Sequence, residues 1–397
     1  MALILGIETS CDETAAAVVR SGERVISNIV SSQYAVHRPY GGVVPELASR
    51  EHLRNIVPVV RAALEAAKID YVGIDAVAVT QGPGLAGALL VGVSYAKALA
   101  FAVGKPLIAV NHLEGHIHAV LLERLQQARS AASVEGADAA AENGLRFPVL
   151  ALVVSGGHTH LYLAERQHES WTYRNIGKTR DDAAGEAFDK VAKLLGLGYP
   201  GGPVIDQLAK HGDVRAVKFT FAQIKSPQRD GKDNDQKKDQ QLAGERFDFS
   251  FSGIKTAVLR YVETHAMQPQ IEARRSALAA VANPKPDDYL ALCDRQTLDL
   301  VASFQRAVVE DLVVKTLAAA QAYEVETLFV TGGVAANREL RATFEESAMR
   351  AGLPVSFPSR PLSTDNAAMI AAAAYPRFLA RDFASGDFSA EAGLALR

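Results

Sequence analysis

The pattern that most constrains this chain is a strand–turn–strand unit that occurs twice. Within Ala2 to Arg20, two apolar strands flank a polar turn, and within Val149 to Glu165 two more flank a small polar turn. Short apolar runs rich in β-branched residues and joined by a polar connection predict a β-hairpin. Two similar hairpins far apart in one chain indicate a long-range duplication.

The segments after the hairpins extend this duplication. Ile74 to Thr80 predicts a strand that leads into a glycine-rich loop and a helix, and Val325 to Thr331 does the same before Gly332. We therefore predict an α/β fold of two duplicated lobes. Ligands of such sheets bind at the carboxyl ends of the strands, so the polar loops of both lobes should surround one cleft.

The chain length favours more than one domain, because 397 residues exceed the size of an ordinary single core. We predict an N-terminal lobe over residues 1–125, a connecting segment over 126–147 and a C-terminal lobe over 148–397. The second lobe carries predicted inserts near 225–246, which is highly charged and should be solvated, and near 265–289, which indicates helices ending in a loop. The C-terminal helix is a candidate for packing back on the first lobe.

Charge and cysteine content narrow the class of protein. The formal net charge of −3 gives no global attraction to nucleic acid, so any RNA contact must use a local patch or a partner. Cys11 and Cys293 form no disulfide framework, which favours a reducing compartment. The longest apolar stretch, Leu85 to Val103, contains Lys97 and predicts a buried helix and not a membrane span. We expect a cytoplasmic protein.

Three glycine loops are candidates for binding phosphate. The loop Gly82 to Gly87 matches the dinucleotide spacing, but Pro83 removes a backbone donor and no acid follows about 20 residues on, so tight helix–strand packing is the better interpretation. Ser155 to His158 and Thr331 to Gly333 follow strands and can present free backbone N–H groups to an anion. Together the loops favour a cleft for a nucleotide or an acyl phosphate.

A pair of histidines, His112 and His116, is the first candidate for metal binding. Residues four apart on a helix share one face, and imidazole is the commonest side-chain metal ligand. Two histidines at this spacing, taken without a third ligand, more often only form hydrogen bonds. Asp365, at a loop–helix junction in the second lobe, is either a helix N-cap or a carboxylate that faces these histidines.

Acidic side chains mark two further places. Asp182, Glu186 and Asp189 are spaced to share one helix face, where they either stabilise the helix dipole or contact a sugar or metal. Asp12 and Glu13 lie in the turn of the first hairpin. They are candidates for orienting or deprotonating a nucleophile. The alternative, that they are ordinary acids of a hairpin turn, has equal weight.

These motifs together closely resemble the bacterial tRNA N6-adenosine threonylcarbamoyltransferase family, whose older name is O-sialoglycoprotein endopeptidase. The resemblance runs in order from about Leu3 to Ala374. The matching segments are Gly6–Thr14, Pro83–Leu85, His112–His116, Val154–His158, Asp182–Asp189, Tyr199–Gly202, Phe249–Gly253, Gly332–Asn337 and Ser363–Asn366.

The resemblance implies an actin-like (ASKHA) fold with nucleotide in the cleft between the two lobes. It implies one divalent metal, with Fe²⁺ favoured and Zn²⁺ possible, held by His112, His116 and Asp365. It implies transfer of a threonylcarbamoyl group from threonylcarbamoyl-AMP to the exocyclic amine of the adenosine beside the anticodon in tRNAs that read codons beginning with A. The implied substrate contacts are Val153, Val154, Ser155, Gly156, Gly157, Asp189, Gly202, Asp206 and Asn337.

The resemblance also implies partners. These are tRNA, threonylcarbamoyl-AMP and accessory subunits of the synthesis complex, namely a paralogous actin-like subunit and a small ATPase. For contact with tRNA the sequence offers Arg50, Arg54, Arg274 and Arg275, although an ordinary solvated face is the more frequent role for any one of them.

Two other functions fit parts of the sequence. A zincin peptidase needs a glutamate directly after the first histidine, but Leu113 stands there and Glu114 follows one position later. An actin-like small-molecule kinase or ATPase would use the same cleft. Such an enzyme usually holds Mg²⁺ through phosphates, whereas two histidines and an aspartate suit a softer metal.

Overall fold

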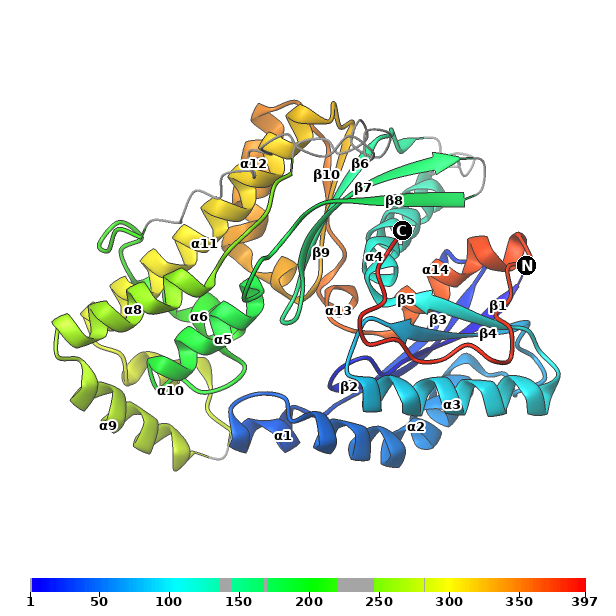
Figure 1. Cartoon of the computed structure of the whole chain (residues 1–397), viewed down its shortest axis with the longest axis horizontal. Helices are drawn as coiled ribbons and strands as arrows, with labels where there is room; N and C mark the ends of the chain where they lie inside the picture. Colours follow the sequence, from blue (N-terminus) through cyan, green and yellow to red (C-terminus); the bar gives the residue numbers. More distant parts are fainter. Residues whose placement is uncertain (1, 136–143, 168–169, 220–245, 282) are drawn as a thin grey trace, which may run out of the picture.

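The computed structural model describes residues 2–135, 144–167, 170–219, 246–281 and 283–397. Two lobes lie side by side, and each contains a five-stranded sheet (Figure 1). The first sheet has the order β3-β2-β1-β4-β5 and the second has the order β10-β9-β6-β7-β8. The strands are β1 (Leu3–Glu8), β2 (Glu13–Arg20), β3 (Arg24–Ser32), β4 (Ala76–Gly82), β5 (Leu107–Asn111), β6 (Val149–Val154), β7 (Thr159–Gln167), β8 (Ser170–Lys178), β9 (Thr327–Thr331) and β10 (Val355–Ser356).

The two sheets have the same topology, which confirms the predicted duplication. In the first, β1 pairs antiparallel with β2 and parallel with β4, and β4 pairs parallel with β5. In the second, β6 pairs antiparallel with β7 and parallel with β9, and β9 pairs parallel with β10. The loops that follow β1, β4, β6 and β9 therefore occupy equivalent places in the two lobes.

Alternating side chains of the first sheet are buried on both of its faces, because helices cover each face. Leu5 and Ile7 pack with α2 (Pro45–Ala67) and α3 (Ala86–Val103) on one side. Ile4 packs on the other side with α4 (His112–Glu135) and α14 (Ala367–Leu379). The last helix of the chain thus lies on the first lobe, the arrangement that the sequence offered as a candidate.

Helix α4 lies between the two sheets and contacts both. Its Ala119 and Leu122 pack with the first sheet, whereas Leu113 and Ile117 pack with β6 and β9 of the second. The N-terminal turn of α4, which carries both candidate histidines, is therefore held where the lobes meet.

Most of the remaining helices cover the other face of the second sheet and pack around the largest apolar core. In addition to α2, α3, α4 and α14, the described helices are α1 (Tyr34–His37), η1 (Arg38–Tyr40), α5 (Ala184–Leu194), α6 (Gly201–Leu208), η3 (Ala209–His211), α8 (Ser252–Thr264), α9 (Gln268–Ala279), α10 (Pro286–Ala291), α11 (Arg295–Ala322), η4 (Gly333–Ala336), α12 (Arg338–Arg350) and α13 (Arg360–Ser363).

The segments predicted as a connection and as inserts have different structures from one another. The predicted boundary at residue 125 falls inside α4, because this helix continues to Glu135. The predicted insert at 265–289 forms α9 and the start of α10, in agreement with the expected helices. The charged insert at 225–246 lies outside the described residues except for Arg246, which donates a hydrogen bond to Asp248.

Helix α3 is the one helix within the described residues that is long and apolar enough to cross a membrane by length and composition. One face of it, including Leu89 and Val93, is buried against the first lobe, and Lys97 donates to the carbonyl of Phe388. Its opposite face is exposed and includes Leu90 and Phe101. The predicted buried helix is therefore buried on one side only.

The close approach of α14 to β1 generates a prediction about stability. A Cβ added at Gly6 would lie 2.3 Å from the carbonyl oxygen of Ala367 and 2.9 Å from the backbone nitrogen of Ala371. We expect Gly6→Ala to lower the free energy of unfolding by about 1–3 kcal/mol or more, because overpacking forces backbone to move. Denaturant unfolding followed by circular dichroism measures this.

Gly253→Ala is the matched control for that substitution. Gly253 lies in the first turn of α8, and an added Cβ there meets nothing within 4 Å. This variant should be as stable as the wild type or slightly more stable, since alanine favours helix over glycine. Equal destabilisation by both variants would show that the α14–β1 contact is not tightly packed.

Candidate metal site and cleft

The two candidate histidines lie one turn apart at the start of α4. Strand β5 ends at Asn111, whose side-chain oxygen accepts a hydrogen bond from the backbone N–H of Leu113 and so caps the first turn. His112 and His116 are both buried, and their ring centroids are 4.7 Å apart in an edge-to-face arrangement. The spacing of four residues therefore brings the rings together as the sequence predicted.

Asp365 joins these histidines and is not the cap of α14. The cap is the next residue, Asn366, whose side chain accepts from the backbone N–H of Met369 at 3.1 Å. The Oδ1 atom of Asp365 lies 3.2 Å from Nε2 of His116 and 3.6 Å from Nε2 of His112. Of the two roles that the sequence left open for Asp365, the structure supports the one that faces the histidines.

Glu8, at the end of β1, orients His112 from the opposite side. Its Oε2 atom is 3.0 Å from Nδ1 of His112 and accepts a hydrogen bond from the Thr80 hydroxyl at 2.7 Å. Its Oε1 atom accepts from the backbone N–H of Ser10. A proton on Nδ1 directed at Glu8 leaves Nε2 free to face Asp365, which is the usual arrangement of a metal-binding histidine and its carboxylate partner.

The electrostatics of this cluster depend on two carboxylates, the buried Glu8 and the partly buried Asp365. Burial opposes protonation of His112, but Asp365 and Glu8 outweigh it and raise the pKa of His112 to about 9. Burial acts against ionisation of Asp365 as well, yet His112 and His116 hold the pKa of this carboxyl well below its usual range. Burial lowers the pKa of the nearby His158 to about 3, so this ring stays neutral. The cluster therefore strongly favours a cation among its carboxylates.

The residues present fit a divalent metal. Ligand atoms from His112, His116 and Asp365 all lie within 4.8 Å of one another. Both ring nitrogens of His116 are buried, and within the described residues neither forms a hydrogen bond, although Nε2 lies 3.2 Å from Oδ1 of Asp365. A buried polar group without a hydrogen bond is costly unless another partner satisfies it. Two imidazoles and one carboxylate are a ligand set that suits iron or zinc.

Glu114, the acid between the histidines, does not share their surroundings. Its carboxylate accepts from the Arg377 guanidinium of α14 at 3.0 Å and is buried. An ion-paired acid in this position is not available as the general base of a zincin peptidase. The structure thus gives a second reason, beyond the spacing, against the peptidase alternative.

A cleft of about 480 Å³ opens next to this cluster and is lined by both lobes. Thr364 lines the cleft, and the next residue is Asp365 of the histidine cluster. The cleft lining includes seven of the residues that the sequence proposed for catalysis or substrate binding, namely Asp12, Glu13, Gly156, Asp189, Gly202, Asp206 and Asn337.

The other four proposed substrate residues do not line this cleft. Val153 and Val154 are buried within β6. Ser155 closes the turn after this strand, because its backbone N–H donates to the His158 carbonyl at 2.8 Å. An added Cβ at Gly157 would meet nothing within 4 Å, so there is open space beside this residue.

The polar side chains that line the cleft also form hydrogen bonds within the protein. Asp206 accepts from Nε of Arg338 at 2.9 Å, and Asn337 caps α12 by accepting from the backbone N–H of Leu340. Asp189 accepts from the backbone N–H of Gly201 at 2.6 Å. Burial raises the pKa of Asp189 to about 6 despite this hydrogen bond. These bonds fix the walls of the cleft in place.

The two hairpin acids, Asp12 and Glu13, line the cleft. The Ser32 hydroxyl donates to Oε1 of Glu13 at 3.4 Å. Burial, then the charges of Asp12 and Asp365, raise the pKa of Glu13 well above its usual range. A carboxylate with a raised pKa is a better proton acceptor than an ordinary one when it is ionised.

Sequence reasoning missed several residues of the site. Glu8 is fully buried, and its signal was an acid at the end of an otherwise apolar strand. Tyr34 and Tyr199 also line the cleft, and their stacked rings have centroids 6.4 Å apart. No spacing rule links these two tyrosines, because they come from different lobes.

One of the four arginines suggested for tRNA contact was wrongly chosen. Arg274 is buried, and its guanidinium donates to the Leu195 carbonyl at 2.6 Å and to the Thr297 hydroxyl at 2.8 Å. It is therefore a structural residue of the second lobe. Arg50 and Arg54 lie on exposed positions of α2, each in an ion pair with a nearby glutamate, and Arg275 is exposed on α9.

The fold and the site define a class of protein. Two duplicated lobes with a cleft between them form an actin-like fold, and a cluster of two buried histidines and a partly buried aspartate adjoins its cleft. Residues 24–372 match the family model described as tRNA N6-adenosine threonylcarbamoyltransferase. The chain belongs to this family of tRNA-modifying transferases.

Similar proteins support this assignment. A protein of Koribacter versatilis (strain Ellin345) named tRNA N6-adenosine threonylcarbamoyltransferase is 67% identical over 396 residues, covering 100% of this chain and 99% of that protein. A protein of the same name from Moorella thermoacetica (strain ATCC 39073 / JCM 9320) is 49% identical, covering 96% and 93%.

A solved structure supports the fold. Full-length HypF in its phosphate- and nucleotide-bound form matches 94% of this chain and 46% of that chain, with 13% sequence identity and a TM-score of 0.52. At this identity the likeness concerns the fold alone.

Removing one carboxylate should test the metal site. We expect Asp365→Ala to lose bound transition metal, because two histidines alone leave too few ligands. His265→Ala, a change at an exposed histidine that follows α8, should keep the metal content of the wild type. Elemental analysis of the purified proteins measures this, and full metal content in Asp365→Ala would show that the cluster is not a metal site.

Glu8 gives a separate test through its contact with His112. Glu8→Gln keeps the shape of the side chain but removes its charge, so it should weaken metal affinity roughly 10–100-fold, as is typical of partners of metal ligands. Competition with a chelator measures the affinity. Unchanged affinity would mean that Glu8 only supports the fold.

Proposed function

We propose that this chain transfers a threonylcarbamoyl group from threonylcarbamoyl-AMP to the exocyclic amine of the adenosine beside the anticodon, in tRNAs that read codons beginning with A, and releases AMP. The observation that carries the proposal is the adjacency of the 480 Å³ cleft, the acids of the first hairpin and the histidine cluster. Family membership supports the reaction type.

The chemistry explains why the donor must be activated. The lone pair of an adenine exocyclic amine is delocalised into the ring, which makes it a poor nucleophile. A mixed anhydride with AMP supplies a good leaving group. The amine nitrogen forms a bond to the carbamoyl carbon, the bond from this carbon to the phosphate oxygen breaks, and the amine proton passes to a base.

The walls of the cleft suit the adenylate. Gly156 and Gly202 bring backbone close to the cleft without side chains, and an added Cβ at either would meet nothing within 4 Å. The start of α6 lies at this wall, where the Gly201 N–H donates to Asp189 and fixes that carboxylate beside the cleft. Asp189 and Asn337 supply acceptor and amide groups for the sugar or base.

Glu13 is our candidate for the base that takes the amine proton. It lines the cleft and its pKa is raised by burial and by neighbouring acids, so its ionised Oε atoms bind a proton more strongly than an exposed carboxylate does. Asp12 lies beside it and can orient the amine by accepting its second hydrogen.

The histidine cluster would hold one divalent metal through His112, His116 and Asp365, with Fe²⁺ favoured and Zn²⁺ possible. Such an ion supplies Lewis-acid stabilisation of negative charge on a phosphate or carbonyl oxygen. Glu8 would keep the His112 ring in the orientation that binding requires.

The proposed partners follow from the substrate. The acceptor lies in a single-stranded tRNA loop, where a base is accessible without breaking a duplex. We also propose accessory subunits, a paralogous actin-like protein and a small ATPase, that supply the adenylate and support turnover. The reaction would take place in the cytoplasm.

The direct test is to incubate the protein with unmodified tRNA and threonylcarbamoyl-adenylate, with and without the accessory subunits. We expect threonylcarbamoyladenosine in the digested tRNA and an equal amount of AMP. Mass spectrometry of the nucleosides measures the product. Absence of modified nucleoside under both conditions would contradict the proposed function.

A substitution at Glu13 tests the assignment of the base. Glu13→Gln should lower kcat roughly 10²–10⁴-fold, the usual contribution of general base catalysis, and leave metal content unchanged. Glu46→Gln, at an exposed position of α2, is the control and should retain full activity. A Glu13→Gln protein with normal kcat would assign the proton to another group.

A further inference from the structure

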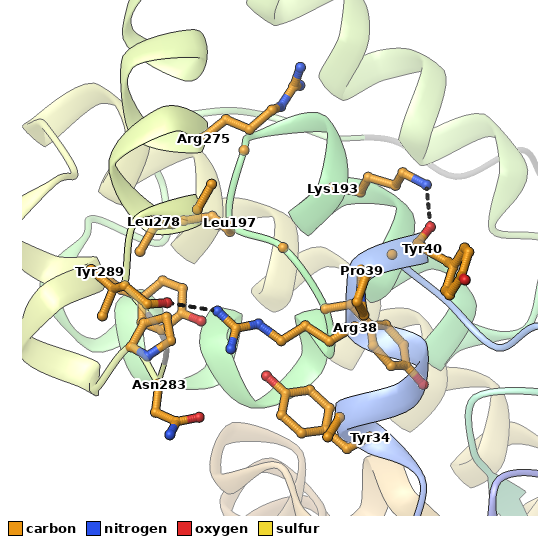
Figure 2. A pocket seen from close by; sticks show the side chains of 18 residues that line it. Tyr34, Arg38, Pro39, Tyr40, Lys193, Leu197, Arg275, Leu278, Asn283 and Tyr289 are labelled. Atoms are coloured by element: carbon orange, nitrogen blue, oxygen red, sulfur yellow. Dashed lines mark hydrogen bonds between the residues drawn. The ribbon is translucent and has the colours of Figure 1, made fainter. Parts of the chain in front are cut away.

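A second cavity, of about 790 Å³, lies between the two lobes on the far side of Tyr34 and Tyr199 from the cleft. Figure 2 shows its walls: α1 and η1 of the first lobe, the end of α5, and the α9–α10 region. We call it the tyrosine pocket, after the four tyrosines that line it, Tyr34, Tyr40, Tyr199 and Tyr289.

The charges of the tyrosine pocket have a single sign. Arg38, Lys193 and Arg275 line it, and none of its lining residues within the described part of the chain is acidic. This is unusual for a protein that has 45 acidic and 42 basic residues and a net charge of −3. The pocket therefore attracts an anion locally although the chain as a whole does not.

The tyrosine pocket and the cleft share one wall. Tyr34 and Tyr199 line both cavities, with ring centroids 6.4 Å apart and planes inclined by 28°. A ligand in the pocket would thus lie directly beside a ligand in the cleft. The exposed arginines of α2 line neither cavity. The position beside the cleft therefore distinguishes the tyrosine pocket from these arginines as a candidate site for RNA.

Two hydrogen bonds join the lobes around the pocket. Arg38 reaches across it and donates to the carbonyl of Val281 at 3.1 Å, and Lys193 donates to the carbonyl of Tyr40 at 3.4 Å (Figure 2). Each of these two bonds ends on a backbone carbonyl, so both side chains are held at the pocket. Within the described residues Lys193 forms no ion pair with a carboxylate, so its charge can meet an anion in the pocket.

Aromatic rings combined with cationic side chains are the chemistry that recognises single-stranded nucleic acid. Bases stack on tyrosine rings, and lysine or arginine contacts the phosphates. The volume is in the range of pockets that enclose a small ligand, and a nucleotide is of this size. A purely apolar ligand would gain nothing from the three cations.

We propose that the tyrosine pocket holds a nucleotide of the acceptor tRNA loop next to the modified adenosine, with its base against the tyrosines and its phosphate near Lys193 and Arg275. This inference rests on the proposed function, because it takes the cleft as the place of the adenylate. The shared wall would then direct the neighbouring adenosine toward the cleft.

A double charge reversal tests whether the cations of the tyrosine pocket attract the tRNA. Lys193→Glu with Arg275→Glu changes two exposed side chains of the pocket, and should raise the KM for tRNA roughly tenfold or more and reduce its salt dependence. The KM for the adenylate should not change. Lys255→Glu with Arg260→Glu, on exposed positions of α8 outside the pocket, is the matched control and should behave as the wild type.

A pair of substitutions at one tyrosine tests stacking. Tyr40 is 59% exposed, so replacing it has little effect on the core. Tyr40→Ala should weaken binding of an unmodified anticodon stem-loop by roughly fivefold or more, whereas Tyr40→Phe, which keeps the ring, should bind as the wild type does. Equal binding by both variants would exclude stacking on this ring.

The position of the RNA is tested directly by photo-crosslinking. A stem-loop with 4-thiouridine beside the target adenosine is irradiated with the full-length protein at saturating concentration, and crosslinked peptides are identified by mass spectrometry. We expect peptides that contain Tyr34, Tyr40 or Tyr289. Crosslinks only at other peptides, or none, would overturn the proposal.

The outcomes separate this inference from the proposed function. If the wild type modifies tRNA but the pocket reversals match the control, the pocket proposal fails and the transferase function stands. If the wild type modifies no tRNA, the function fails, and the inference fails with it. If the reversals abolish binding of free AMP but not of RNA, the pocket is a mononucleotide site and the proposal is overturned.

Discussion

The packing of α14 against the first sheet is the contact on which the site depends. Asp365 comes directly before this helix, and its position is fixed by the cap at Asn366 and by the docking of the alanine-rich helix on β1. Gly6 permits that docking, since any side chain there would meet the carbonyl of Ala367. A residue near the end of the sequence thereby reaches histidines that lie about 250 positions earlier.

The cluster that results is held together by charge. Glu8 and Asp365 flank His112 from two sides in a buried setting, where the interaction between charges is strong. One proton on His112 offsets part of the negative charge, and a divalent cation would offset more. His116 contributes two nitrogens that make no hydrogen bond within the described structure. Asp365 thus contributes both to the raised pKa of His112, together with Glu8, and to the metal ligand set, together with the two histidines.

The sequence predicted those parts of the fold that depend on local pattern. The hairpins, the glycine loops and the histidine pair each depend on a few consecutive residues, and the structure contains them. Glu8 was missed because an acid at a strand end looks like the start of a turn, and only tertiary packing buries it beside His112. Arg274 was misplaced for the converse reason, since its partners Leu195 and Thr297 are distant in sequence. The predicted connection from residue 126 begins inside α4, because this helix continues to Glu135 through a stretch of weak apolar pattern.

The arrangement of the tyrosines links the two cavities mechanically. Tyr34 belongs to the first lobe and Tyr199 to the second, so their shared wall exists only while the lobes stay in this relation. The bond from Arg38 to Val281 and the bond from Lys193 to Tyr40 cross the same boundary. A rotation of one lobe against the other would therefore change the width of the cleft and of the tyrosine pocket together. Occupation of either cavity would in turn favour the lobe arrangement that its ligand fits, so the shared wall would couple the two sites.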